Sequence, residues 1–212
     1  MTQQTTCRQC GTCCRKGGPS FHLSDKHLID SGKIPARFLF TLRCGELAHE
    51  NIQGKVAPVT TDLIKIKGKN GTWTCVFLNE ETNQCGIYEN RPAECRALMC
   101  WDPCDIKAIY HHQRLTRKDL LQNVTGLWEL VKTHQARCDY GVILDLIQKI
   151  RNRSNRTLHN QLKEMIAYDT QIRTLATERS GINKELTDFL FGRPLTTTLP
   201  PLFTLHPSSP TL

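Results

Sequence analysis

The run Cys7-Arg8-Gln9-Cys10-Gly11-Thr12-Cys13-Cys14 places four thiols within eight residues. Two residues between successive cysteines let one turn of chain bring their sulfurs to neighbouring positions around a metal, and Gly11 relaxes the backbone between them. Adjacent side chains point apart, so Cys13 and Cys14 either serve two metals or leave one thiol unused. Because core packing does not explain so many clustered thiols, the run predicts a metal site.

A second set of cysteines lies further along the chain and consists of Cys75, Cys85, Cys95, Cys100 and Cys104. The first of these is expected at the end of a strand and the second after a turn. Cys95 is expected in the first turns of a helix that begins at Arg91-Pro92, since proline suits that position. A strand end, a turn and a helix start can converge, so these three sulfurs are predicted to meet at one metal.

The cysteine content sets the chemical class of the protein. There are 11 cysteines among 212 residues, an odd number that rules out complete pairing within the chain, and ten of them lie in the first 104 residues. With no apolar leader at its start, the chain is expected in the cytoplasm, where thiols stay reduced and bind metals. Cys44 and Cys138 stand apart and are expected to be structural or free thiols.

Net charge and hydropathy limit the classes of partner that the sequence supports. The net charge is +8 and the sequence pI is about 9.0, but thiolates bound to metal would remove part of this positive balance. Nucleic acid is therefore not the expected partner, and the basic run at Arg151, Arg153 and Arg156 is interpreted as a solvated helix end. No apolar stretch is long enough to span a membrane. A protein partner could bind the C-terminal helices, but the sequence identifies none.

Short elements are expected around the cysteines. Ser24 should cap a short helix that Gly32 ends, and residues 35–42 should form a second one. Two alternating runs, 62–67 and 72–77, flank Asn70-Gly71 and predict a β-hairpin.

Helical periodicity begins beyond Pro103. The segments with this spacing are 115–134, 141–150, 155–177 and 182–191. Residues 193–212 hold five of the ten prolines and are expected to be disordered.

The predicted fold is α+β and mostly α, with an irregular cysteine-rich module followed by a helical part. The expected domains are a metal-binding domain over residues 1–104, a helical extension over 105–192 and a tail over 193–212. Metal binding should supply much of the folding free energy of the first domain, because little regular structure is predicted there.

Three motifs in order resemble a known family. They are Cys-x-x-Cys-x-x-Cys-Cys from Cys7, Cys-x-Phe-Leu from Cys75, and Cys-Gly-Ile-Tyr-x-x-Arg-Pro-x-x-Cys-Arg from Cys85. Together they resemble the YkgJ-type CxxCxxCC cysteine-cluster family, a zinc- or iron-chelating domain with eight shared cysteines, over roughly residues 7–104. The resemblance implies that seven of the eight are Cys7, Cys10, Cys13, Cys14, Cys75, Cys85 and Cys95. The eighth is either Cys100 or Cys104.

The cofactor is predicted to be an iron–sulfur cluster or zinc. The CxxCxxC spacing slightly favours a cluster, whereas zinc accepts any four converging sulfurs. The flagellin lysine methylases are a related group, and the alternative function is an iron–sulfur enzyme that uses S-adenosylmethionine. No Gly-rich loop of a Rossmann-type methyltransferase is present, so enzyme activity stays open and no catalytic residue is named.

Some side chains near the cysteines have two interpretations. Arg91 and Arg96 either donate hydrogen bonds to thiolates or form a salt bridge at a helix start. Trp73, Trp101 and Trp128 are expected to lie in the core.

Overall fold

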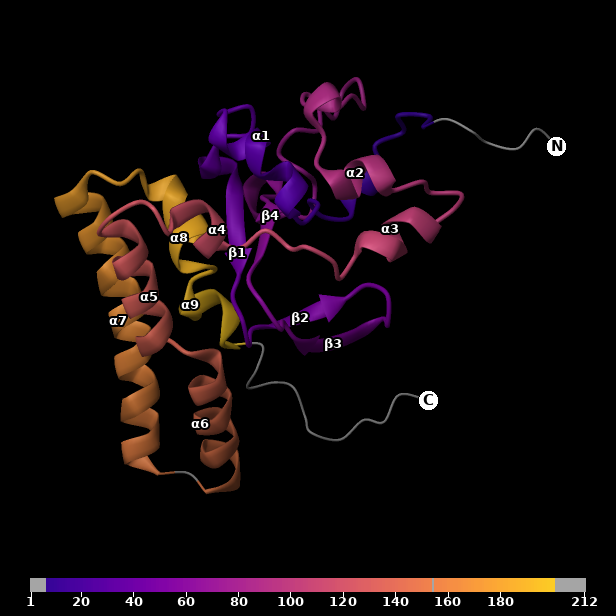
Figure 1. The fold of residues 1–212 in the computed structure, drawn as a ribbon. Coiled ribbons are helices and arrows are strands. Elements are labelled where there is room, and N and C mark those ends of the chain that lie inside the picture. Colours follow the sequence, from indigo (N-terminus) through magenta and orange to yellow (C-terminus); the bar gives the residue numbers. More distant parts are fainter. Residues whose placement is uncertain (1–6, 154, 201–212) are drawn as a thin grey trace.

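The computed structural model describes residues 7–153 and 155–200 (Figure 1). It contains two small antiparallel sheets. In one, β1 (Leu39–Leu42) pairs with β4 (Leu63–Ile66), and in the other β2 (Leu47–Glu50) pairs with β3 (Lys55–Pro58). The registers place Leu39 opposite Ile66 and Leu47 opposite Pro58. The predicted α+β, mostly α fold is confirmed.

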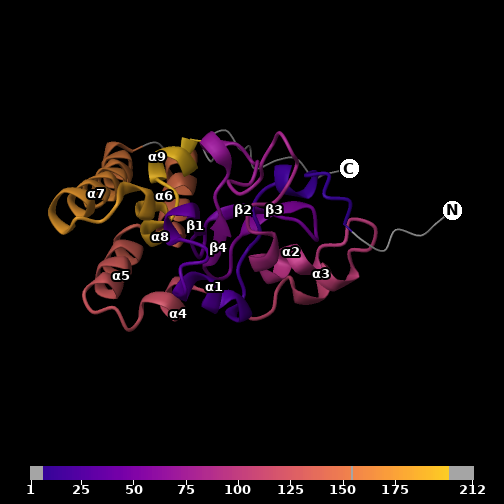
Figure 2. The ribbon, with the colours of Figure 1, turned by 90° about the horizontal axis from the view of Figure 1, so that it is seen from above.

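Short helices lie near the cysteines and longer ones follow. The first group is α1 (Lys26–Asp30), α2 (Ala93–Ala97) and α3 (Cys104–Ile109). The second group is α4 (Arg117–Leu121), α5 (Leu127–Arg137), α6 (Tyr140–Asn152), α7 (Arg156–Ser180), α8 (Thr187–Phe191) and α9 (Leu195–Thr198). Figures 1 and 2 show α5, α6 and α7 on one side of β1 and β4, with α2, α3 and the N-terminal segment on the other.

Capping residues set the helix boundaries of the C-terminal part. The Asn155 side chain accepts a hydrogen bond from the Thr157 amide at the start of α7, and Gly181 ends that helix at a φ of 62°. The segment predicted as one helix over 115–134 is broken by Gly126, whose φ is 81°. Helix α6 covers the predicted 141–150, and α7 covers most of 155–177.

Two hydrophobic clusters form the core. The larger one joins the β1–β4 sheet to the helices that cover it, through residues such as Phe21, Leu39, Ile64 and Phe191. The smaller one fills the space between α6, α7 and α9. The Thr41 hydroxyl in β1 also donates to the Phe189 carbonyl at 2.7 Å. Because residues before and after 104 share the larger cluster, the domain boundary at 104 stays a prediction.

The predicted β-hairpin is wrong in its pairing. Residues 63–66 do form a strand, but its partner is β1, a segment predicted as helix. Pro35 starts that segment with an extended ψ of 136°, and Leu39 and Thr41, which share one face of the strand, are both buried. Around Asn70 the chain makes a 3₁₀ turn, and 72–77 contributes only one bridge, between Gly68 and Cys75. The hairpin of this fold is β2–β3.

Two further expectations need correction. The disordered tail does not extend back to residue 193, because Leu195 and Leu199 are buried around α9; residues 201–212 lie outside the described part. Trp73 is 70 % exposed and not part of the core. Within the part of the chain that is described, no helix is long and apolar enough to cross a membrane.

Candidate metal centre

The CxxCxxCC run is tied to a distant turn by Arg15. Its guanidinium donates to the Cys10 carbonyl at 3.2 Å and to the Asn83 side chain at 2.6 Å. Cys13 begins a 3₁₀ turn that ends at Arg15, so the guanidinium reaches back over the run that precedes it. Asn83 lies just before Cys85 in sequence, so this contact brings the two cysteine segments together.

The chain after the run packs against β4. A side chain at Gly18 would place its Cβ 2.2 Å from the Ile66 carbonyl oxygen, so only glycine fits there. The Phe21 amide donates to the Ile64 carbonyl at 2.9 Å, and the Cys75 amide donates to the Cys14 carbonyl at 2.7 Å. These backbone contacts hold the first motif beside Cys75.

A tight turn brings Cys85 back towards Cys75. The Asn79 amide donates to the Gln84 carbonyl, and the Gly86 amide donates to the Phe77 carbonyl, both at 2.8 Å. Leu78 and Cys85 form an antiparallel bridge. The turn therefore brings Cys85 back beside Leu78, three residues after Cys75, and the meeting of the two sulfurs at one metal stays a prediction.

Helix α2 carries Cys95, and two buried carboxylates anchor its start. Glu94 accepts a hydrogen bond from the Ser20 amide at 2.6 Å, and Asp25 accepts one from the Ala93 amide at 2.9 Å. Ser20 and Asp25 both follow the first motif in sequence, so these contacts fix Cys95 relative to Cys13 and Cys14.

Five sulfurs gather as a result, those of Cys13, Cys14, Cys75, Cys85 and Cys95. The Sγ atoms of Cys13 and Cys14 are 4.0 Å apart, so these adjacent side chains do not point apart as expected, and the hydrogen bond between them lowers the pKa of Cys13 to about 6. Burial raises the pKa of Cys95, and repulsion from Cys75, Cys85 and Cys13 raises it further. Burial and repulsion from Cys85 and Cys13 likewise raise the pKa of Cys75. Burial and mutual repulsion thus disfavour the thiolate forms of Cys75 and Cys95, and a bound cation would favour these forms.

The other predicted ligands lie on the surface, and they are Cys7, Cys10, Cys100 and Cys104. Cys10 donates to the Thr12 hydroxyl at 3.2 Å and lies near Cys13. Cys104 begins α3 beside Asp102. Among residues 7–153 and 155–200, no three of the cysteine sulfurs lie within 4.8 Å of one another. The ligand set and the choice between Cys100 and Cys104 therefore stay predictions.

Arg91 and Arg96 have different roles. The Arg91 guanidinium lies 3.6 Å from the centre of the Tyr88 ring, and its charge contributes to the lowered pKa of Cys13. Arg96 donates to the Arg91 carbonyl and lies 3.5 Å from the Asp25 carboxylate. Arg91 thus lies close to the thiols, whereas Arg96 forms the salt bridge at the helix start.

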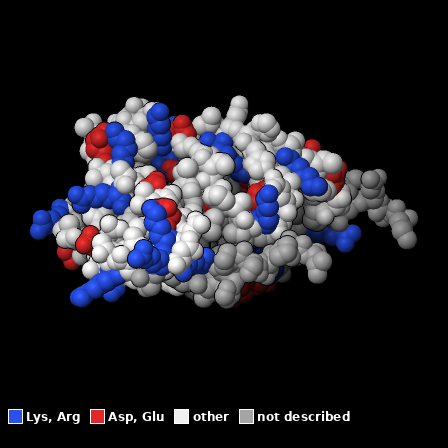
Figure 3. Space-filling view, turned by 90° about the horizontal axis from the view of Figure 1, so that it is seen from below, with Lys and Arg blue, Asp and Glu red and all other residues white. Residues whose placement is uncertain are grey.

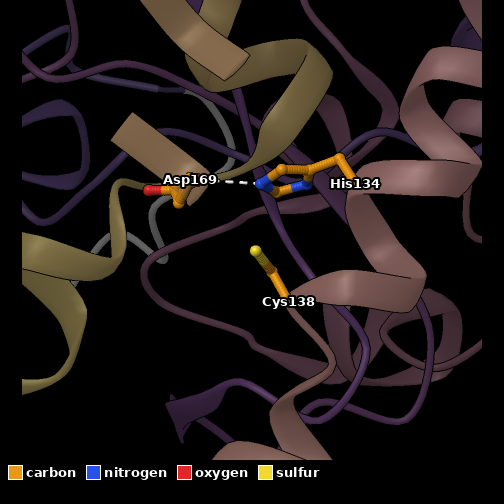
Figure 4. Close-up of side chains that lie close together, drawn as sticks. All are labelled: His134, Cys138 and Asp169. Carbon is orange, nitrogen blue, oxygen red and sulfur yellow. Dashed lines mark hydrogen bonds and ion pairs between the residues drawn. The ribbon is translucent and has the colours of Figure 1, made fainter. Parts of the chain in front are cut away.

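A second group of potential metal ligands was not predicted from the sequence (Figure 4). His134 and Cys138, one helical turn apart at the end of α5, face Asp169 of α7, and all three are buried. The Asp169 carboxylate accepts from His134 Nε2 at 2.8 Å and from Arg173 Nε at 3.0 Å on one oxygen, and from the Leu195 amide at 2.9 Å on the other. The spacing of His134 and Cys138 is the one signal in the sequence, because Asp169 lies on another helix.

This group is a structural clamp. The Asp169 oxygens are already occupied by three donors, and Arg173 supplies the positive charge that a metal would bring. A second cation, Arg43, donates to the Cys138 carbonyl at 2.8 Å. Nδ1 of His134 has no partner among the described residues, but two neighbouring guanidinium groups disfavour a metal ion here. The clamp fixes α5 to α7 and to the segment at α9.

The surface charge shows no single basic band on the face drawn in Figure 3. Lysine and arginine side chains are scattered there among acidic and uncharged ones. The absence of a nucleic-acid partner stays a prediction.

Comparison with known proteins identifies the family. The model of the CxxCxxCC family, described as a zinc- or iron-chelating domain, matches residues 6–119, which is more than half of the chain. No curated protein and no solved structure matches the chain. The match spans all five gathered cysteines and every other predicted ligand, and it ends before the clamp at His134. The chain therefore belongs to the CxxCxxCC family of zinc- or iron-chelating domains.

Proposed function

We propose that this protein chelates its metal through Cys13, Cys14, Cys75, Cys85 and Cys95. The observation that supports this most strongly is the convergence of three separate cysteine segments by backbone hydrogen bonds and carboxylate anchors. Cys7, Cys10 and either Cys100 or Cys104 would be outer ligands, at positions where the thiols are exposed on the surface. The metal stabilises the fold of this region or carries electrons.

The distance between the sulfurs of the adjacent residues Cys13 and Cys14 supports zinc. Four thiolates about 2.3 Å from one zinc ion sit about 3.8 Å from each other in a tetrahedron. The separation of 4.0 Å between Cys13 and Cys14 Sγ is close to that edge. In a cubane each thiolate binds its own iron at a different corner, so the sulfurs lie further apart.

An iron–sulfur cluster is supported by the number and spacing of the thiols. Five sulfurs gather where one zinc ion takes four, and Cys7, Cys10 and Cys13 have the CxxCxxC spacing typical of cluster binding. Buried surroundings such as those of Cys75 also suit a cluster, because they limit its contact with water.

Metal analysis of protein purified without oxygen tests the function and separates the two metals. A coloured protein with iron and sulfide indicates a cluster, and a colourless one with zinc indicates the single ion. Cys75→Ser and Cys85→Ser should lower the metal content, whereas Cys44→Ser, whose thiol is exposed and outside the five, should retain it. Wild-type protein without either metal, or a Cys75→Ser variant with full metal content, would contradict the proposal.

The methylase alternative needs its own experiment. Calorimetric titration of the metal-loaded protein with S-adenosylmethionine should give a binding isotherm if the chain is such an enzyme. If no heat of binding is measured, the methylase alternative loses its support and the chelating function stands by itself.

A further inference from the structure

Lys65 lies beneath the cysteine site in a strand that is otherwise apolar. It stands between the buried Ile64 and Ile66 of β4, and its ammonium donates to the Ser20 hydroxyl at 3.1 Å. Burial and the nearby Arg114 lower the pKa of Lys65, while the charges of Glu94 and Cys95 act in the opposite direction. A charged lysine among apolar side chains costs folding free energy unless a group of opposite charge compensates it.

The charges around Lys65 do not cancel. Arg114 forms an ion pair with Glu94 at 2.5 Å, with both side chains less than a tenth exposed. Glu94 also accepts from the Ser20 amide. Two cations, Lys65 and Arg114, therefore share one carboxylate, and one positive charge is left over beside Cys95.

The site on the other side of this network needs positive charge. Four thiolates around Zn²⁺ carry a net charge of about −2. Arg91 lies near Cys13, at one edge of the site. Cys95 lies at another edge, where burial penalises a thiolate most, and Glu94 adds a further negative charge there. Lys65 supplies the excess positive charge at this edge of the site.

We propose that Lys65 is a positioning residue of the metal site, whose ammonium, hydrogen-bonded to Ser20 in the network of Glu94, offsets the charge of the metal-bound thiolate at Cys95. This inference rests on the proposed chelating function. It separates the role of Lys65 from that of Glu94 and Asp25: the two carboxylates hold α2 in place, and the ammonium balances the charge of the thiolate that α2 carries.

Two substitutions of Lys65 distinguish charge from shape. Lys65→Met keeps the length of the side chain and removes the charge, and Lys65→Arg keeps the charge. Lys67→Met is the matched control, because Lys67 follows on the same strand but pairs with Asp188 at 3.8 Å and donates to the Glu185 carbonyl, away from the cysteines. All variants are made in the full chain.

Zinc affinity is measured by competition with a chelator, and thermal stability is measured on the metal-free protein. Lys65→Met should weaken zinc binding about tenfold or more, as loss of a residue behind metal ligands does, while its metal-free melting temperature should rise because a buried charge is gone. Lys65→Arg and Lys67→Met should bind zinc as the wild type does. If the site holds an iron–sulfur cluster, Lys65→Met should instead shift the reduction potential to a more negative value.

The decisive result is that Lys65→Met lowers the zinc affinity but raises the melting temperature of the metal-free protein. Equal zinc affinity in Lys65→Met and wild type overturns the inference. So does a parallel loss of affinity and metal-free stability in both Lys65 variants, which would mark Lys65 as a packing residue. If the wild type binds no metal, the proposed chelating function is wrong. If the wild type binds zinc and Lys65→Met binds it equally well, only the role of Lys65 is wrong, so the two failures can be told apart.

Discussion

The cysteine region and the C-terminal helices are built on different principles. Between residues 7 and 109 the helices have six residues or fewer, and two short sheets, isolated bridges, tight turns and buried carboxylates hold the chain. Between 117 and 200, α6 and α7 carry side-chain caps, and the long helices α5, α6 and α7 pack through apolar faces. The first region brings several thiols near one another in surroundings that disfavour their thiolate forms. The second is stabilised by apolar burial, by helix caps and by the clamp at Asp169.

Metal removal should separate the two regions most strongly. A structural zinc site contributes roughly 10–16 kcal/mol to folding in small zinc peptides, and a large part of that should be lost from the cysteine region. Hydrogen exchange read by mass spectrometry should show faster exchange at the amides of Cys75 and Gly86 after chelation. The amides of α6 and α7 should stay protected. Equal deprotection of both regions would contradict the contrast.

Arg117 connects the two regions and should give the next largest effect. It is 2 % exposed, pairs with Asp62 at 2.6 Å and donates to the Leu190 carbonyl at 2.8 Å. Arg117→Met leaves Asp62 without its cation and should cost about 3–5 kcal/mol in chemical denaturation. The neighbouring Lys118→Met, on the exposed side of α4, serves as the control. A loss below 1 kcal/mol for Arg117→Met would argue that the regions are not coupled through it.

The clamp should make the helical region sensitive to acid. Burial lowers the pKa of His134 to about 4, against the opposing hydrogen bond to Asp169, whereas the ordinary value in an unfolded chain is about 6.5. Because the unfolded state binds the proton first, stability should fall as the pH drops from about 6.5 to 4, by up to about 3 kcal/mol. His134→Gln keeps a donor for Asp169 and should flatten the stability profile over that range.

The profile is measured by urea denaturation at a series of pH values on metal-free protein. A wild-type curve that is flat between pH 6.5 and 4, or a His134→Gln curve with the same slope, would refute a neutral buried His134.

The smallest effect should come from the apolar core of the helical region. Ile143 is fully buried in α6, and Ile143→Val removes one methylene, which costs about 0.5–1.5 kcal/mol. Metal content should be unchanged, because the site lies in the other region. Loss of metal from this variant, with its fold retained, would show that the two regions depend on each other more closely than their contacts indicate.

The fold class and the family could be predicted from the sequence, whereas the strand pairing could not. Cysteine spacing predicts that Cys75, Cys85 and Cys95 meet at one metal, and this ligand set stays a prediction. The strand pairing failed because β1 and β4 are joined by contacts across the chain, and a local Asn-Gly signal cannot weigh these against a hairpin. Lys65 and the partners of Asp169 were not predicted, because their roles depend on burial next to residues distant in sequence.

The anchor between Ser20 and Glu94 spans 74 positions of the chain, and the sheet beneath it is covered by a helix near residue 189. During synthesis, therefore, the first four cysteines leave the ribosome long before their partners exist. Until Cys95 has emerged and α8 has docked, they are open to stray metals and oxidants. Metal uptake by the cysteine region would therefore depend on how fast these later segments fold onto it.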